Sequence, residues 1–335
     1  MYKKFSRSLT TTLAICGLLA MNSAYSQASP TAQQIKDYPS RPIRLVVPYV
    51  AGGPMDVVGR LIGQKIPAIL GHGFVLDNKG GAGGAIGTDI VAKSAPDGYT
   101  MLVTSSSHAS LPIISKNLPY DPIKDFTPIT LAVNSVGFII VARPDLPAKD
   151  LAEFVADAKA NPNKYTFGSG GIGNVMHFAG ESFSASANIK LTHVPFKGVS
   201  QALTELMASR IDIFIGAATA VLPLVKSGKV RALAITANKR WSELPDLRTV
   251  DEQGIKGFAF TPWYGFWYPA KVPQSYVIKM QSAIAKVLED GEVRHAFAEQ
   301  GFVAVGSSSA EFSKVIADEI ARNEKLATVV DFSQN

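Results

Sequence analysis

Cysteine is almost absent from this chain of 335 residues, because Cys16 is the only one and it lies near the start of the sequence. Once the first segment is removed, the chain can form neither disulfide bonds nor thiolate metal sites. Histidine is also scarce and shows no His-Glu-x-x-His pattern and no close pair, so we expect no metal site and no cofactor. The histidines are His72, His108, His177, His193 and His295.

Long hydrophobic runs are missing as well, apart from one at residues 9–21 that follows Lys3, Lys4 and Arg7. Such a run is shorter than the ~20 residues that a membrane helix needs, and it is typical of a secretory signal peptide. We therefore expect residues 1–26 to be a secretory signal peptide. Cleavage after Ala28 satisfies the small-x-small preference equally well.

Charge is moderate, at 18% of residues against 47% hydrophobic ones, which is typical of an ordinary globular protein. The formal net charge of +6 is not concentrated in Lys/Arg-rich runs. Without such a basic patch, nucleic acid is a poor partner for this chain.

What the chain does have is an alternation of short β-rich runs with helical periodicities, which predicts an α/β fold with mostly parallel sheets covered on both faces. Two proline-bearing strands, at 126–133 and 258–268, are interpreted as crossings between two such units. Residues 38–134 and 257–335 would then form one lobe and residues 135–256 the other. The expected strands lie at 43–47, 74–76, 100–103, 138–141, 165–167, 191–194, 211–215 and 231–235.

Two glycine-rich loops follow strands in the first half of the chain. In α/β sheets, ligands bind beyond the carboxyl ends of strands, where helix N-termini present unpaired N–H groups. In the loop at 49–56, the amides beside Gly52 and Gly53 are the better binding candidates, and Asp56 favours a structural role because a carboxylate repels an anion. The loop at 79–87 has neither P-loop nor Rossmann spacing, so it indicates either an anion-binding nest or tight packing.

Two further loops carry polar side chains. Ser105, Ser106, Ser107 and His108 follow a strand, and they are either ligand-binding hydroxyls or ordinary loop residues. No Gly-x-Ser-x-Gly elbow occurs, so we expect no enzyme.

The stretch "GSGGIGN" at 168–174 contains the G-x-G-x-x-G spacing, but no acidic residue follows about 20 residues later, which argues against a dinucleotide. His177 at the start of the following helix either faces a cleft between the two lobes or caps the helix.

The order of these loops resembles the Bug, or TctC, family of periplasmic solute receptors. The resemblance covers essentially the whole mature chain through "PYVAGGPMD", "NKGGAGGAIGTDIVAKSAPDGYT", "LPYDPIKDFTPIT", "GSGGIGNVMHFAGE", "HVPFKG", "SGKVRALAITANKR" and "LPDLRTVDEQG". It implies a two-lobed periplasmic binding protein of the type II, Venus flytrap form, with two hinge crossings.

The resemblance also implies which residues bind the ligand, mostly through backbone amides and hydroxyls. They are Tyr49, Gly52, Gly53, Met55, Gly83, Gly84, Ala85, Ser105, Ser106, Ser107, His108, Ser169, Gly170, Gly171, Asn174, His177, Lys197, Ala217 and Thr219, with Tyr49, Phe196 and Trp263 as candidate apolar walls.

Two departures from the family pattern change the expected ligand. Residues 216–220 read Gly-Ala-Ala-Thr-Ala where many members have an Asp-Asn pair, and Pro54 and Met55 replace small polar residues. Both make the pocket less polar, so we expect an aromatic or aliphatic carboxylate that lacks an amino group.

The function that follows is a receptor that binds a small organic acid and delivers it to the integral membrane subunits of a tripartite tricarboxylate-type transporter. A sensor that reports occupancy to a membrane partner is an alternative, and a secreted hydrolase is a weaker one. A cleft receptor needs no second copy, so we expect a monomer.

Overall fold

The fold was analysed in a computed structural model that describes residues 29–115 and 117–328. The expected signal peptide lies outside the described residues. The strands are β1 (Ile43–Val47), β2 (Phe74–Asn78), β3 (Thr100–Ser105), β4 (Phe126–Ser135), β5 (Phe138–Ala142), β6 (Thr166–Ser169), β7 (Thr192–Pro195), β8 (Ile213–Ala217), β9 (Arg231–Ile235), β10 (Trp263–Pro269) and β11 (Phe302–Ala304).

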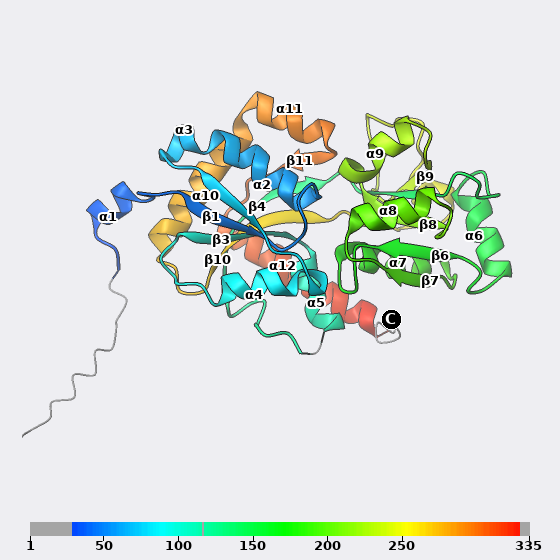
Figure 1. The fold of residues 1–335 in the computed structure, drawn as a ribbon, viewed down its shortest axis with the longest axis horizontal. Helices are drawn as coiled ribbons and strands as arrows, with labels where there is room; N and C mark the ends of the chain where they lie inside the picture. Colours follow the sequence, from blue (N-terminus) through cyan, green and yellow to red (C-terminus); the bar gives the residue numbers. More distant parts are fainter. Residues whose placement is uncertain (1–28, 116, 329–335) are drawn as a thin grey trace, which may run out of the picture.

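The helices surround these strands on both sides (Figure 1). They are α1 (Ala32–Asp37), α2 (Pro54–Lys65), α3 (Pro67–Leu70), α4 (Ala85–Ala92), α5 (Ser107–Ile114), α6 (Leu151–Ala160), α7 (Val175–Ala187), α8 (Val199–Met207), α9 (Ala218–Lys226), α10 (Gln274–Glu289), α11 (Gly291–Glu299) and α12 (Ser309–Ala327), with the short 3₁₀ turns η1 (Ala82–Gly84) and η2 (Asp251–Gln253).

The strands form two separate sheets, and each sheet with its helices is called a lobe here (Figure 1). The sheet of the first lobe has the strand order β11-β4-β10-β3-β1-β2, and that of the second has β7-β6-β8-β5-β9. The two-lobed α/β architecture predicted from the sequence is confirmed.

The pairing within the sheets differs from the prediction of mostly parallel strands. β1 pairs in parallel with β2 and β3, and β6 with β7 and β8, but the other pairings are antiparallel. The reason is the chain path: β4 runs toward the second lobe and β10 runs back from it, so the two neighbours point in opposite directions.

The second crossing is also shorter in strand than predicted. Residues 258–262 have irregular backbone, and β10 begins only at Trp263, directly after Pro262. A proline lacks the N–H that a strand ladder needs, so the strand starts where that donor returns. β10 therefore belongs wholly to the first sheet, and residues 254–262 make the connection between the lobes.

Alternate residues of each strand face opposite sides of the first sheet. Leu45 and Val47 pack in a core with α2, α10 and α11, whereas Val46 packs in another core with α4, α5 and α12. A single larger core fills the second lobe around both faces of its sheet. Both sheets are thereby covered, and the loops at the strand ends are left to form the space between the lobes.

The apolar face that runs over residues 58–69 is divided between two helices. α2 ends at Lys65, and Pro67 starts a separate short helix, α3, before the left-handed Gly71. α12 begins with a capping box: Ser308 Oγ accepts the amide of Glu311 at 3.2 Å, and Glu311 Oε2 accepts the amide of Ser308 at 2.9 Å.

Candidate ligand-binding cleft

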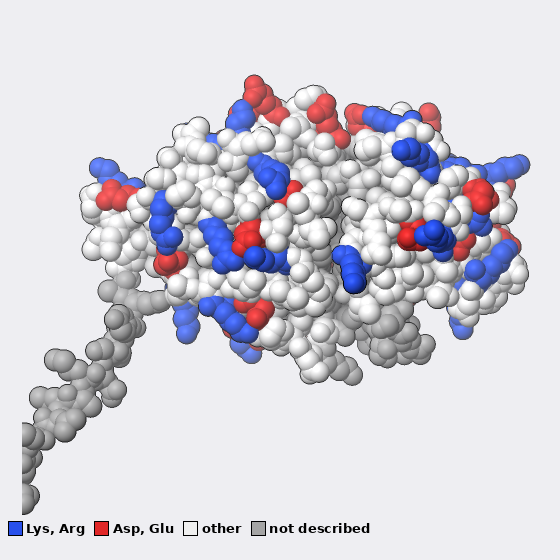
Figure 2. Space-filling model, in the orientation of Figure 1, with Lys and Arg blue, Asp and Glu red and all other residues white. Residues whose placement is uncertain are grey.

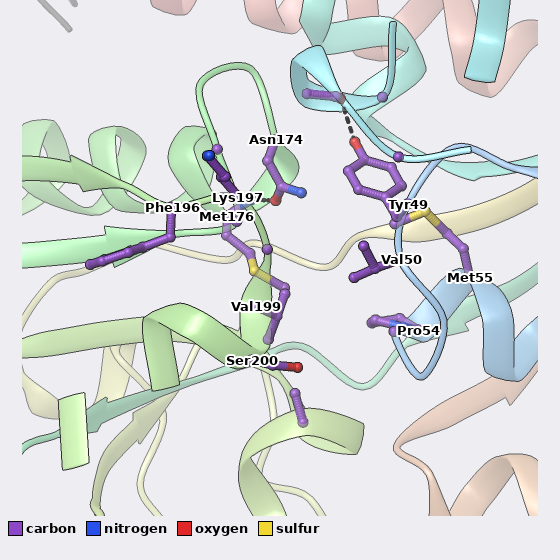
Figure 3. A pocket seen from close by; sticks show the side chains of 18 of the residues that line it. Tyr49, Val50, Pro54, Met55, Asn174, Met176, Phe196, Lys197, Val199 and Ser200 are labelled. Carbon is purple, nitrogen blue, oxygen red and sulfur yellow. Dashed lines mark hydrogen bonds between the residues drawn. The ribbon is translucent and has the colours of Figure 1, made fainter. Parts of the chain in front are cut away.

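A cleft of about 960 Å³ lies between the two lobes (Figure 3). We call its lining from the first lobe the first wall, and its lining from the second lobe the second wall. The first wall comprises residues 49–56, 80–84 and Tyr264, and the second comprises 170–172, 174–176, 195–201, Leu203, Thr219 and Ala220.

The first wall is built around Asp56, in the first turn of α2. Its carboxylate accepts hydrogen bonds from the Gly52 amide at 3.0 Å, from Arg60 Nε at 2.8 Å and from Asn78 Nδ2 at 3.2 Å. Burial raises the pKa of Asp56, but these donors outweigh it and hold the pKa below its usual value. The carboxylate is fully used within its own lobe, which agrees with the structural role favoured from the sequence.

Tyr49 joins the two glycine loops of the first wall. Its hydroxyl donates to the carbonyl oxygen of Gly83 at 2.6 Å and lies 3.3 Å from Ser107 Oγ. Burial raises the pKa of Tyr49 to about 12, so the phenol keeps its proton. A Cβ atom on Gly84 would lie 2.9 Å from this hydroxyl, and Gly84 has a φ of 103°. Only glycine fits both the contact and the backbone conformation.

The second wall presents hydrogen-bond donors. Asn174 is the N-cap of α7, and its Oδ1 accepts the amide of Met176 at 2.9 Å. That bond fixes the orientation of the side-chain amide, so the Nδ2 group is left to point toward Tyr49 across the cleft (Figure 3). Lys197 forms no ion pair with any described residue, whereas the buried Thr219 Oγ1 has no hydrogen-bond partner among them.

Several helices begin at this cleft. α2 begins at Pro54, α7 at Val175 and α8 at Val199, all of which line it, and Thr219 and Ala220 are the second and third residues of α9. The first amides of a helix lack intrahelical acceptors, and the helix dipole adds a partial positive charge there. The cleft is therefore electropositive without a cluster of cationic side chains.

Some of the residues proposed from the sequence line the cleft and others do not. Those that line it are Tyr49, Gly52, Gly53, Met55, Gly83, Gly84, Gly170, Gly171, Asn174, Phe196, Lys197 and Thr219. Those that do not are Ala85, Ser105, Ser106, Ser107, His108, Ser169, His177, Ala217 and Trp263.

Residues 105–108, which we call the serine loop, lie behind Tyr49 rather than in the cleft. Ser105 Oγ is 2.9 Å from Ser107 Oγ, and both residues are buried. His108 packs between Phe126 and Trp267, and its Nε2 is 2.8 Å from the carbonyl oxygen of Pro122. Burial lowers the pKa of His108 to about 4, so it is a neutral core residue.

Trp263 points away from the cleft. Its indole Nε1 donates to Glu319 Oε2 at 3.3 Å, and its ring packs edge-on against Phe312. The neighbouring Tyr264 lines the cleft instead. Strand side chains alternate between faces, so the sequence analysis selected the wrong member of the pair.

Sequence reasoning missed most of the apolar lining. Val50, Met176, Val199 and Leu203 line the cleft, but their apolar side chains look like ordinary core residues in a sequence. The only available signal was their position just after strand ends or at helix starts.

Among the described residues, no group of three or more His, Cys, Asp or Glu could hold a metal ion. No described helix is long and apolar enough to cross a membrane.

Comparison with known proteins gives consistent matches. Residues 58–331 match the model of the tripartite tricarboxylate transporter family receptor. Protein BugT of Bordetella pertussis is 32% identical over 318 residues, which cover 94% of this chain and 96% of BugT.

Two solved structures from Rhodopseudomonas palustris are also similar. Rpa4515, solved with adipate, has a TM-score of 0.83 and 31% identity, covering 87% of this chain and 98% of that one. MatC, solved with bound malate, has a TM-score of 0.81 and 30% identity, covering 86% of this chain and 99% of that one.

Proposed function

This chain belongs to the tripartite tricarboxylate transporter receptor family, and on that premise we propose that it is a periplasmic receptor for a small organic acid. The acid binds in the cleft between the lobes, and the loaded receptor delivers it to the membrane subunits of a tripartite tricarboxylate-type transporter. The observation that carries the proposal is the convergence of helix N-termini and fixed hydrogen-bond donors on a cleft whose one lining carboxylate, Asp56, is already paired.

The donors favour a ligand group that only accepts hydrogen bonds. Asn174 has its oxygen occupied by Met176, and Gln201 Oε1 accepts the amide of Lys197 at 3.2 Å. Both side chains therefore have only their NH₂ groups to offer. A carboxylate matches such a site, since its oxygens are acceptors and its charge is stabilised by the helix N-termini.

The remaining lining favours a carboxylate with an apolar body. Val50, Met55 and Val199 carry no hydrogen-bonding group, and Figure 3 shows Val50 and Val199 on facing sides of the cleft with Met55 beside Tyr49. An ammonium group would need an acidic partner, and Asp56 is occupied by Arg60. An aliphatic or aromatic acid without an amino group fits best. The adipate and malate of the related structures support the choice of organic acids as a class.

The family supports a binding role and not catalysis, and it supports delivery at the membrane. On the face shown in Figure 2, acidic and basic side chains are interspersed over both lobes, so nothing there suggests a polyanionic partner. Closure of the lobes around the acid would make one surface from both lobes, which a transporter can distinguish from the open form.

The proposal is tested by thermal shift and calorimetry on the purified protein with hexanoate, benzoate, adipate, malate, glutamate and glucose. Hexanoate, benzoate or adipate should raise the melting temperature most, because they combine a carboxylate with an apolar body and have no amino group. A ligand at about 100 times its Kd stabilises a protein by about 2.7 kcal/mol, which is large enough to detect. Glutamate should have less effect than adipate, since its ammonium group finds no partner. A shift with glucose and none with any carboxylate would overturn the proposal.

A further inference from the structure

The loop at 170–173 of the second wall rests on buried polar side chains from three different elements. Ser169 ends β6, His193 lies on β7 and His177 lies in the first turn of α7. None of them lines the cleft, and their exposed fractions are 0%, 9% and 0%. Two of these residues, Ser169 and His177, were expected to contact the ligand, so the structure calls for a different role.

Ser169 holds the start of the loop. Its Oγ accepts the amide of Gly171 at 3.1 Å and lies 3.2 Å from the carbonyl oxygen of Gly171 and 2.7 Å from Nε2 of His193, the nearer of the two acceptors for its proton. When Nε2 carries no proton, the serine hydroxyl donates to it, which turns the oxygen lone pairs toward the amide. His193 therefore orients the hydroxyl, and the hydroxyl orients the loop.

His177 holds the end of the same loop. Its Nδ1 accepts the amide of Gly173 at 3.4 Å, and its ring stacks on His193 with a centroid distance of 4.0 Å and an angle of 10°. Burial lowers the pKa of His177 to about 4, so the ring is neutral and Nδ1 can accept at neutral pH. The stacked rings join the two supports into one unit.

The supports act on backbone that has few alternatives. Gly171 and Gly173 have φ angles of 126° and 78°, and both amides are occupied by Ser169 and His177. The amides of Gly170 and Ile172 have no acceptor in the described part of the chain, and both residues line the cleft. Alternate amides of the loop are thus tied down and left available.

We propose that Ser169, His193 and His177 are positioning residues that fix the loop at 170–173 so that its free amides are preset for the ligand. This inference rests on the proposed function for its consequence, since the preset amides serve the bound acid. The pair of Ser169 and His193 also resembles a nucleophile and its base, but Ser169 is fully buried and its oxygen accepts the amide of Gly171 in its own loop. A role through the loop is the one that its geometry allows.

The test is hydrogen exchange, measured by mass spectrometry on the ligand-free protein, in the peptide that covers residues 170–176. Ser169→Ala and His193→Leu should each speed exchange there about tenfold, while peptides from β5 and β8 stay unchanged. His193→Gln should restore protection, because its side-chain amide can occupy the place of Nε2. Ser184→Ala is the matched control, since it removes a buried hydroxyl that donates to Gly180 O at 2.8 Å on the far side of α7's first turns.

Unchanged exchange at 170–176 in Ser169→Ala and His193→Leu, or equal acceleration throughout the second lobe, would overturn the positioning role. The consequence is measured separately as the Kd for adipate, which Ser169→Ala should raise about tenfold with Ser184→Ala unaffected. If wild-type protein fails to bind adipate and the other acids, the proposed function falls, whereas the exchange comparison still decides whether these residues fix the loop.

Discussion

The two walls of the cleft differ in how their polar groups are hydrogen-bonded. In the first wall, Asp56 and Tyr49 form hydrogen bonds within their own lobe. Asp56 bonds to Arg60 and Asn78, and Tyr49 bonds to Gly83. In the second wall, the Nδ2 group of Asn174 faces Tyr49 across the cleft, the side chain of Lys197 is exposed, and the buried Thr219 Oγ1 has no partner among the described residues. Under the proposed function, the first wall would give the cleft its shape and the second wall would supply most of the attraction for the anion. Substitutions in the two walls should therefore weaken ligand binding in different ways.

The largest effect is expected from Asn174→Asp in the second wall. Aspartate is as good an N-cap as asparagine, so α7 should keep its stability. The change replaces a donor with a negative charge beside the ligand carboxylate, and the affinity for adipate should fall about 100-fold, or about 2.7 kcal/mol. Calorimetry measures the Kd, and Asn188→Asp, at the other end of the same helix, is the control. An unchanged Kd would place the acid away from Asn174.

Gly83→Ala should have the next largest effect, by disturbing the fit between the walls. A Cβ on Gly83 would overlap the carbonyl oxygen of Ile172 in the other lobe, and Gly83 has a φ of 63°. Gly52→Ala is a matched control, because Gly52 has a φ of 83° but no atom within 4 Å of such a Cβ. Both variants should lose about 1 kcal/mol of stability to backbone strain.

Only Gly83→Ala should also weaken adipate binding, by about tenfold, because it keeps the lobes from meeting. The two variants are compared by chemical unfolding and calorimetry. Equal losses of affinity in both would mean that strain within the first lobe, and not contact between the lobes, limits binding.

Lys197→Ala should have a smaller effect on binding. Its side chain is exposed, so water and salt screen its attraction for the acid, and a loss of about threefold is expected at low ionic strength. The loss should vanish in about 1 M salt, where the screening length is ~3 Å. Lys190→Ala, another exposed lysine of the second lobe, should change nothing. A large loss that persists in salt would show that the ammonium group touches the ligand directly.

Glu181→Gln, on α7 behind the second wall, should leave the Kd unchanged and alter only the pH dependence of stability. Burial raises the pKa of Glu181 to about 7, so the folded state disfavours the charged form. The resulting penalty is absent below the unfolded pKa near 4.5, grows as pH rises, and is complete above pH 7. The variant should therefore melt a few degrees higher than wild type at pH 8 and equally at pH 4.

Glu299→Gln is the control for that comparison. Glu299 is an exposed glutamate four residues after His295, just as the buried Glu181 lies four residues after His177. A gain in melting temperature from Glu181→Gln that is the same at pH 4 and pH 8 would contradict an origin in the carboxyl's ionisation.

Sequence patterns predicted the parts of this molecule that depend on local physics. Strand and helix alternation predicted two α/β lobes, and glycines after β1 and β6 marked loops that do line the cleft. The choice between Trp263 and Tyr264 depended on strand phase, which the sequence does not reveal because every residue of β10 is buried and no polar-apolar alternation marks its two faces. The prediction that Ser105, Ser106 and Ser107 line the cleft was wrong because Tyr49, from the loop after β1, lies between them and the cleft.

Apolar lining could not be predicted for a different reason. A valine such as Val199 is favoured at a buried position whether its neighbour is a core residue or a ligand, so its type carries no information about the cleft. Likewise, His177 and His193 are far apart in sequence and become partners only because β7 passes beside α7.

The path of the chain between the sheets affects how the protein can be made. The whole second lobe is inserted between β4 and β10, and the Ser135 amide, at the end of β4, donates to the Pro262 carbonyl at 2.8 Å. During synthesis β3 and β4 are complete long before β10, the strand that must lie between them. The second lobe is continuous in sequence and can form first. Until the last quarter of the chain emerges with β10 and β11, β3 is unpaired on one edge and β4 on both edges.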